Sequence, residues 1–180
     1  IITEVRFNDS FALYRPTSTA YWFKRLRKLV KITGLENLKT ENVTNMCQMF
    51  WSLKSLASLD LSGLNTSNVT DMSGMFASST GLSSLNLNGF NTSNVTNMSW
   101  MFDSAQISDL TPLANWNVGN VTDMSYMFRS TQISDLTPLK DWDVGNVIRM
   151  YMMFCNIPTL TNSSAISGWN VSKVGTFAYI

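Results

Sequence analysis

Histidine is absent from this chain of 180 residues. The chain therefore lacks the commonest general base and the commonest metal ligand, and it cannot form a histidine-based serine or cysteine relay. A P-loop, a dinucleotide-binding fingerprint and a Gly-x-Ser-x-Gly motif are also missing. We expect a protein that is not an enzyme and that needs no cofactor and no metal.

Charged residues are scarce as well. They make up 14% of the chain, with a formal net charge of +1, whereas a typical soluble domain has about 25%. Ser, Thr and Asn, 59 residues together, take their place. Such a surface lacks the dense positive field of a nucleic-acid-binding protein. No apolar run approaches the roughly 18 residues of a membrane span. We therefore expect no nucleic-acid partner and no membrane span.

A 26-residue repeat dominates the chain. Asn-Val recurs at that spacing from Asn42 to Asn146, and Lys173-Val174 follows after 27 residues. The first four copies read NVTNMCQMF, NVTDMSGMF, NVTNMSWMF and NVTDMSYMF, and the fifth, NVIRMYMMF, is degenerate. We number each unit from its Asn, so that Met stands at positions 5 and 8 and Phe at position 9. A period this strict predicts stacked units that bury one another's apolar side chains.

Within a unit the apolar period changes. Leu59 and Leu61 alternate with polar residues, as do Leu85 and Leu87, and this alternation predicts a short strand. The apolar residues of segment 69–76 are spaced i, i+3, i+6 and i+7, which predicts a short helix entered through a second extended piece. The fold class is therefore an α/β repeat solenoid with a short strand and a short helix per unit. We interpret the Met and Phe residues as core, not as a cofactor site.

The later units depart from this pattern. Pro112 and Pro138 fall in the strand segment, and proline cannot donate a ladder hydrogen bond, so these strands should be shorter or interrupted. The position held by Leu64 and Phe90 becomes tryptophan in three units. We interpret these tryptophans as core fillers rather than ligand platforms: Trp116, Trp142 and Trp169.

The chain reads as one continuous domain with a start, an array and an end. Residues 1–41 predict an N-terminal cap with a first partial repeat, in which Trp22-Phe23 stands in for Met-Phe. Residues 42–172 hold five repeats, and residues 173–180 begin a further or capping repeat. The basic segment 22–30 predicts a helix with outward charges. It is either a solvated part of the cap or a patch for a membrane surface or nucleic acid.

The run LASLDLSGLNTSNVTDMSGMF at residues 56–76 resembles the BspA-like leucine-rich repeat of bacterial surface proteins. Segments 11–23, 32–46 and 107–128 resemble other parts of such arrays. The resemblance implies a right-handed leucine-rich repeat solenoid and a secreted or cell-surface adhesion module. It also implies a host extracellular or bacterial surface partner, either a protein or a glycan. The alternative is a structural spacer that holds another domain away from the surface.

Two weaker signals concern cysteines and calcium. Cys47 and Cys155 lie four units apart, about 19 Å at the spacing of stacked strands. A disulfide needs Cα atoms within about 7 Å, so we expect free thiols. Segment 141–146 has a calcium-loop-like spacing, but Met152 stands where a calcium hand needs Glu. We interpret its aspartates as replacements for turn asparagines.

Two surfaces remain for a partner, and we expect a monomer to present them. One is the sheet face, where residues that alternate with core leucines point outward: Ser58, Asp60, Ser84, Asn86 and Asn88. The other is position 7, which varies between constant core neighbours and holds Trp100, Tyr126 and Met152. Stacked units would turn these into an exposed apolar ladder, the mark of a binding site unless loops cover it. At position 10, Asp103 should lie beside Arg129.

Overall fold

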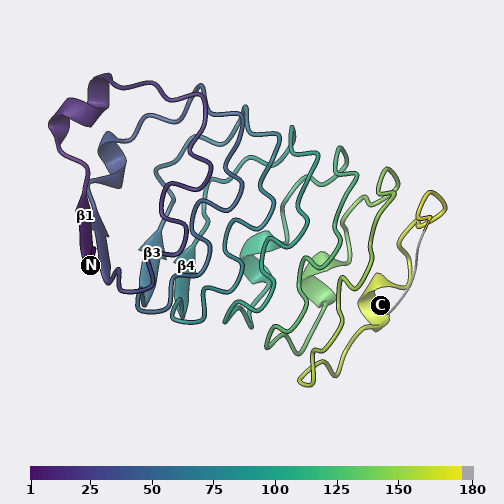
Figure 1. The fold of residues 1–180 in the computed structure, drawn as a ribbon. Coiled ribbons are helices and arrows are strands. Elements are labelled where there is room, and N and C mark those ends of the chain that lie inside the picture. Colours follow the sequence, from purple (N-terminus) through teal and green to yellow (C-terminus); the bar gives the residue numbers. More distant parts are fainter. Residues whose placement is uncertain (176–180) are drawn as a thin grey trace.

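The computed structural model describes residues 1–175 as a solenoid whose coils follow one another along one axis (Figure 1). The repeat solenoid predicted from the sequence is confirmed. The strands are β1 (Glu4–Arg6), β2 (Lys31–Thr33), β3 (Ser58–Asp60) and β4 (Ser84–Asn86). The 3-10 helices are η1 (Asp9–Leu13), η2 (Leu35–Asn37), η3 (Thr111–Leu113), η4 (Thr137–Leu139) and η5 (Ser164–Ile166).

Parallel pairing joins each coil to the next. β1 pairs with β2, and β3 pairs with β4 with Leu59 opposite Leu85, as the alternating leucines predict. A second ladder follows position 4 of the units, where single parallel bridges join one coil to the next. This ladder is the second extended piece expected ahead of the Met-Phe segment. Its members are Ser18, Asn45, Asp71, Asn97, Asp123 and Arg149.

The Met-Phe segments are turns, so the prediction of a short helix at 69–76 is wrong. The amide of Phe76 donates to the carbonyl of Met101 in the next coil at 2.9 Å. The amide of Met75 instead closes a turn on Met72 in its own coil at 3.2 Å. The amides thus alternate between the neighbouring coil and the local turn. An α-helix would keep these hydrogen bonds within the unit and leave the coils unjoined on this side.

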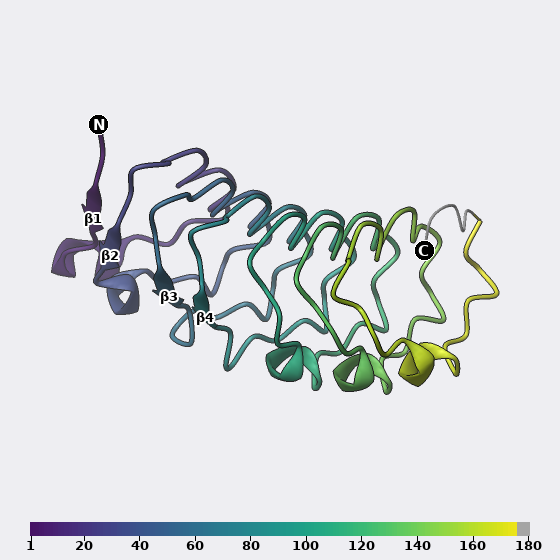
Figure 2. The same cartoon turned by 90° about the horizontal axis from the view of Figure 1, so that it is seen from below.

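The proline-containing units exchange the strand for a 3-10 helix. Pro112 and Pro138 stand in the first turn of η3 and η4, where the fixed φ of proline suits a helix and its missing N–H costs nothing. The predicted interruption of these strands is confirmed. Figure 2 shows the helices continuing the row that β3 and β4 begin along one side of the solenoid.

The basic segment 22–30 forms turns, and the prediction of a helix there is wrong. The amide of Phe23 donates to the carbonyl of Met49 at 2.9 Å, and its ring stacks on Phe50 at 5.2 Å. Residues 15–41 therefore form a coil of their own ahead of the first repeat. In this leading coil, Tyr21 and Lys24 fall at positions 7 and 10.

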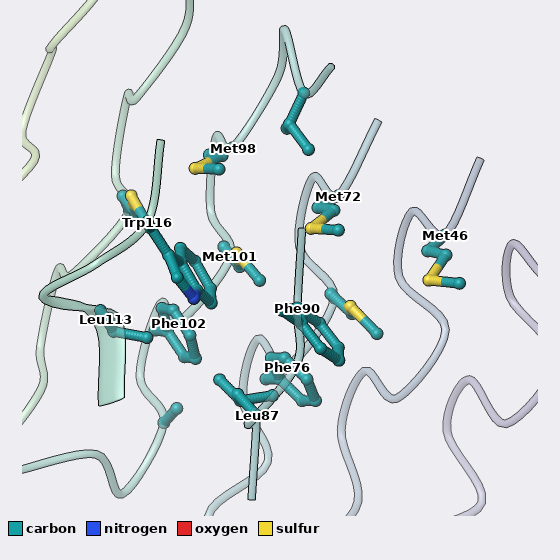
Figure 3. Close-up of a cluster of buried hydrophobic side chains, with 14 of the residues drawn as sticks. Met46, Met72, Phe76, Leu87, Phe90, Met98, Met101, Phe102, Leu113 and Trp116 are labelled. Atoms are coloured by element: carbon teal, nitrogen blue, oxygen red, sulfur yellow. The ribbon is translucent and has the colours of Figure 1, made fainter. Parts of the chain in front are cut away.

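The core consists of columns of like side chains (Figure 3). Phe76, Phe102 and Phe128 are fully buried, with ring centres 5.5 and 5.7 Å apart. Trp142 is also buried, and its indole N–H donates to the carbonyl of Leu113 at 3.1 Å. Trp116 is buried as well, and Trp169 is half-buried and packs against the core. The interpretation as core fillers is therefore confirmed for Trp116 and Trp142 and holds in part for Trp169.

The remaining features concern the ends and the thiols. Cys47 is buried and Cys155 half-buried, both as free thiols. A further repeat was predicted at 173–180, and its residues 176–180 lie outside the described residues. The amide of Gly175 donates to the carbonyl of Ile148 in the preceding coil at 3.1 Å. Within residues 1–175, no helix is long and apolar enough to cross a membrane.

Candidate functional site

Positions 7 and 10 of successive coils form a stripe of variable side chains, which we call the turn stripe. Position 7 holds Tyr21, Gln48, Gly74, Trp100, Tyr126 and Met152. Position 10 holds Lys24, Trp51, Ala77, Asp103, Arg129 and Cys155. A turn hydrogen bond brings the two positions together in each coil, as from the amide of Trp51 to the carbonyl of Gln48 at 3.2 Å. The stripe therefore runs from coil to coil beside the Met and Phe core.

The backbone at position 7 takes a left-handed conformation. The φ angle is 61° at Trp100, 62° at Tyr126 and 60° at Gly74. This conformation favours glycine and costs other residues about 1 kcal/mol. Gly74 shows that the coil needs no side chain here. The turn thus accepts side chains of every size at position 7, and the rings of Trp100 and Tyr126 are not required by the backbone conformation.

Trp100 and Tyr126 stack on each other, with ring centres 3.9 Å apart and planes 20° apart. Trp100 is 39% exposed, and Tyr126 is half-buried. Tyr151 meets Tyr126 edge-on at 5.2 Å. Met152, the third predicted member of the ladder, is half-buried at the next position 7. Tyr151 was missed by the sequence reasoning, although a tyrosine at position 6, which is small in the other units, is a signal that could have found it.

Arg129 is fixed against these rings by Asp103, as predicted from their shared position. Its Nε and Nη2 atoms donate to the two carboxylate oxygens of Asp103 at 2.7 and 3.2 Å. The guanidinium lies 4.9 Å from the ring centre of Trp100 and 5.0 Å from that of Tyr126. This donation to the Asp103 carboxylate raises the pKa of Arg129. The cation is thus permanent and pre-oriented for contact.

The leading coil and the first repeat add a second aromatic and cationic group. The Lys24 ammonium lies 4.8 Å from the ring centre of Tyr21 and 4.4 Å from that of Trp51. Arg25 lies 5.2 Å from the same ring of Trp51. The sequence analysis did not place Tyr21 and Lys24 beside Trp51, because the leading coil lacks the Asn-Val-Thr motif that sets the register. Aligning Trp22-Phe23 with Met-Phe places Tyr21 and Lys24 in the stripe.

A hollow of about 450 Å³ interrupts the turn stripe between these two groups. Gly74 and Ala77, the smallest residues at positions 7 and 10, lie at the coil between its aromatic walls. Trp51 belongs to the coil before, and Trp100 to the coil after. The remaining lining residues are Gln48, Ser78, Asp103 and Arg129.

The predicted sheet-face residues lie on and after β3 and β4, and two of them, Asp60 and Asn86, hold turns with their side chains. Asp60 accepts hydrogen bonds from the Ser62 amide at 2.9 Å and from the Asn86 side chain at 3.0 Å. Asn86 in turn accepts from the Asn88 amide at 3.0 Å. The Ser62 amide is the main cause of a lowered pKa at Asp60. Ser58 and Ser84 are exposed at the start of β3 and β4. This face therefore commits Asp60 and Asn86 to turns and leaves Ser58, Ser84 and Asn88 exposed.

In segment 141–146, whose spacing is similar to that of a calcium loop, a carboxylate also accepts a hydrogen bond from a turn amide. Asp143 accepts from the Gly145 amide at 3.0 Å, just as Asn117 accepts from the Gly119 amide at 3.0 Å one unit earlier. Asp143 thus takes the place of a turn asparagine. Among residues 1–175, no cluster of His, Cys, Asp or Glu side chains could hold a metal ion.

Comparison with known proteins assigns the chain to a family. The family described as "Mycoplasma protein of unknown function, DUF285" matches residues 17–137 and 106–180. The chain belongs to the DUF285 family. No curated protein matches it. The likeness of this DUF285 chain to BspA-like repeats stays a prediction.

Solved structures with some likeness to this DUF285 chain come from Listeria monocytogenes. Internalin C2 is 19% identical, with a TM-score of 0.27, and the match covers 88% of this chain and 62% of internalin C2. The internalin InlF is 16% identical, with a TM-score of 0.23, and the match covers 85% of this chain and 61% of InlF. The DUF285 chain thus spans less than two thirds of either internalin.

Proposed function

We propose that this DUF285 chain is a non-catalytic interaction module of a bacterial surface, which binds a host extracellular or bacterial surface partner through the turn stripe. The proposal rests on the stacked pair of Trp100 and Tyr126, whose ring centres lie 3.9 Å apart at backbone positions with positive φ. The left-handed backbone recurs at position 7 of every coil, Gln48 and Met152 included, so the stacked rings and not the backbone distinguish this pair. Because Gly74 fills the same position without a ring, packing alone does not account for the aromatics.

The chemistry of the stripe supports binding. Trp, Tyr and Arg are the residue types that dominate the energetics of protein interfaces, and here Trp100, Tyr126 and Arg129 lie in mutual contact. Asp103 holds the guanidinium in place before a partner arrives. A pre-ordered side chain loses less conformational entropy on binding than a free one.

The resemblance of segment 56–76 to BspA-like repeats supports secretion or display at the cell surface, and with it the right-handed winding of leucine-rich repeats. A monomer is part of the proposal. The rival function is a spacer, which would need the regular stacking but no exposed rings. The turn stripe favours binding over that rival.

The test is the double variant Trp100→Gly/Tyr126→Gly. It should stay folded, because Gly74 occupies the same backbone conformation with φ near 60°. It should lose adhesion to host matrix or bacterial cells by at least about tenfold, the scale of one modest hot spot. The measurement is adhesion of the purified fragment, with circular dichroism as the check of folding.

A matched control is Ser58→Ala/Ser84→Ala on the sheet face, which should adhere like the parent. Unchanged adhesion of the folded glycine variant would remove the turn stripe as the site and leave the sheet face. Failure of the parent to adhere to any of these surfaces would favour the spacer.

A further inference from the structure

A pocket opens on the sheet side of the solenoid, between the coil that contains β4 and the coil that contains η3. Its volume is about 200 Å³. Leu85 lines it from the first coil, and Ile107 and Ser108 line it from the second. The fully buried rings of Phe76 and Phe102 also belong to its lining. The pocket therefore reaches from the exposed Ser108 into the apolar core.

A column of leucines ends at this pocket. Position 18 of successive units holds Leu59, Leu85 and then Thr111. Leu59 lies opposite Leu85 in the β3–β4 pair and is only 5% exposed. Leu85 itself is half-buried, and Thr111 is exposed at the start of η3. No leucine of the next coil therefore covers Leu85 as Leu85 covers Leu59, and the pocket lies in the place of that missing leucine.

The backbone edge of β4 is open at the same place. On β3, the carbonyl of Ala57 accepts a hydrogen bond from the amide of Ser84 in the next coil at 3.1 Å. One coil later, Ser83 stands in the place of Ala57. Within residues 1–175, no backbone hydrogen bond joins segment 83–87 to segment 105–113, because η3 replaces the next strand, and Figure 2 shows η3 set apart from β4. A strand edge with free N–H and C=O groups is a template for pairing with another chain.

The edge and the pocket together fit an extended segment with one apolar side chain. In a parallel ladder a residue donates its amide to the neighbouring strand and accepts from it through its carbonyl, and the next side chain points to the opposite face. A segment that pairs with Ser83 and Leu85 in this way turns its next side chain inward. A cavity of about 150 Å³ lined by Leu, Ile and Phe holds benzene, so this pocket has room for one leucine or phenylalanine side chain.

We propose that an extended segment of a partner protein adds a strand to the open edge of β4 and places one leucine or phenylalanine side chain in this pocket. Its amide donates to the carbonyl of Ser83, and its carbonyl accepts from the amide of Leu85. The side chain that follows continues the column of Leu59 and Leu85. The site is separate from the turn stripe, since its lining within residues 1–175 includes no residue of positions 7 and 10.

Ser108→Trp is the variant that blocks the mouth of the pocket. Ser108 is exposed at position 15 of its unit and lines the pocket. The matched control is Ser134→Trp, which changes an exposed serine at the same position one coil later, outside the lining of the pocket. Both variants should fold, because neither serine is part of the core. Circular dichroism and thermal midpoints compare them with the parent.

The probes are synthetic pentapeptides that copy residues 83–87 with the sequence SSLNL, acetylated and amidated at the ends, and a second version with Phe in place of the first Leu. Binding is followed by nuclear magnetic resonance through the amide of Leu85 and the methyl groups of Ile107. The parent and Ser134→Trp should bind alike, and Ser108→Trp should bind at least tenfold more weakly. A folded Ser108→Trp that binds like the parent, or a parent that binds neither peptide, would overturn the site.

Two altered peptides separate strand pairing from simple filling of the pocket. Asp in place of the first Leu removes the apolar side chain, and N-methylation of the second serine removes the amide that donates to Ser83. Each change should weaken binding to the parent at least tenfold. An N-methylated peptide that binds as well as the unmodified one would overturn the added strand, since its side chains are unchanged.

The same peptides distinguish this site from the turn stripe. The folded variant Trp100→Gly/Tyr126→Gly should bind them like the parent, because both rings lie outside the pocket. Loss of peptide binding in that variant would overturn the separate site. Peptide binding by the parent, together with unchanged adhesion of the glycine variant, would keep the pocket and remove the turn stripe.

Discussion

Single residues of the repeat recur because each satisfies the backbone of a neighbouring coil. The side-chain amide of Asn94 donates to the carbonyl of Ser67 at 2.7 Å, and that of Asn120 to Ser93 at 2.7 Å. At position 4, Asp71 accepts from the Ser73 amide at 2.8 Å, a contact that Asn makes equally well. The repeated residues are thus committed to structure, and variable positions are left to meet a partner.

The stacked phenylalanines give the sharpest prediction at this scale. Phe102→Ala removes a fully buried ring that contacts Phe76 and Phe128 on either side. We expect the free energy of unfolding to fall by about 3–5 kcal/mol. Ser84→Ala, on the exposed sheet face, should cost less than about 0.5 kcal/mol. Urea midpoints measure both, and similar midpoints would show that the inside and the outside are reversed.

At the scale of elements, the sequence predicted the strand correctly, but it predicted a helix where the structure has turns. The alternation of Leu59 and Leu61 is specific to an extended chain that is buried on one side. The i, i+3 spacing of Met72 and Met75 is shared by helices and by stacked turns. A helix and a stacked turn differ in which carbonyl each backbone amide donates to, and here alternate amides donate to a carbonyl of the next coil. Pro112 correctly indicated that the strand is interrupted, but not that η3 would replace it.

The turns along the sheet face predict an acid-sensitive stability. The pKa values of Asp109 and Asp135 are lowered chiefly by the hydroxyl groups of Thr111 and Thr137, and that of Asp60 by the Ser62 amide. A carboxylate whose folded pKa is lowered stabilises the protein above its unfolded pKa, near 3.9, and this contribution is lost as pH falls through the folded pKa.

The variant Asp60→Asn/Asp109→Asn/Asp135→Asn should therefore be somewhat less stable than the parent at pH 7, and it should lose less of its stability than the parent below about pH 4. Asn86 accepts the equivalent turn amide, so asparagine preserves the turns. Urea unfolding at pH 7 and pH 3 measures the difference. Parallel losses in the parent and the variant would mean that these turns do not govern acid stability.

At the scale of the whole molecule, the columns and the stacked pair of Trp100 and Tyr126 follow from the 26-residue period. The hollow does not follow from it, because the hollow lies where Gly74 and Ala77 stand in place of the larger side chains of other coils. One of its lining residues, Trp51, comes from position 10, which a turn hydrogen bond places beside position 7. The period predicts the features that every coil shares, and it cannot predict those that depend on a difference between coils.

The last prediction tests the array itself. Deleting residues 68–93 removes one whole unit, so that Ser67 joins Asn94 and every column stays in register. The protein should still fold cooperatively, because each coil contacts only its neighbours. The denaturant m-value should fall by about one seventh, in proportion to the surface lost.

Deleting residues 68–90 removes nearly the same mass but shifts the following coils by three positions. Met and Phe side chains would then face polar positions of the preceding coil, and the amides that join the coils would lose their carbonyl partners. We expect this variant to unfold without a cooperative transition, as followed by circular dichroism in guanidinium chloride. Equal folding of the two deletions would contradict the role of the 26-residue register, since the register is the only property in which they differ substantially.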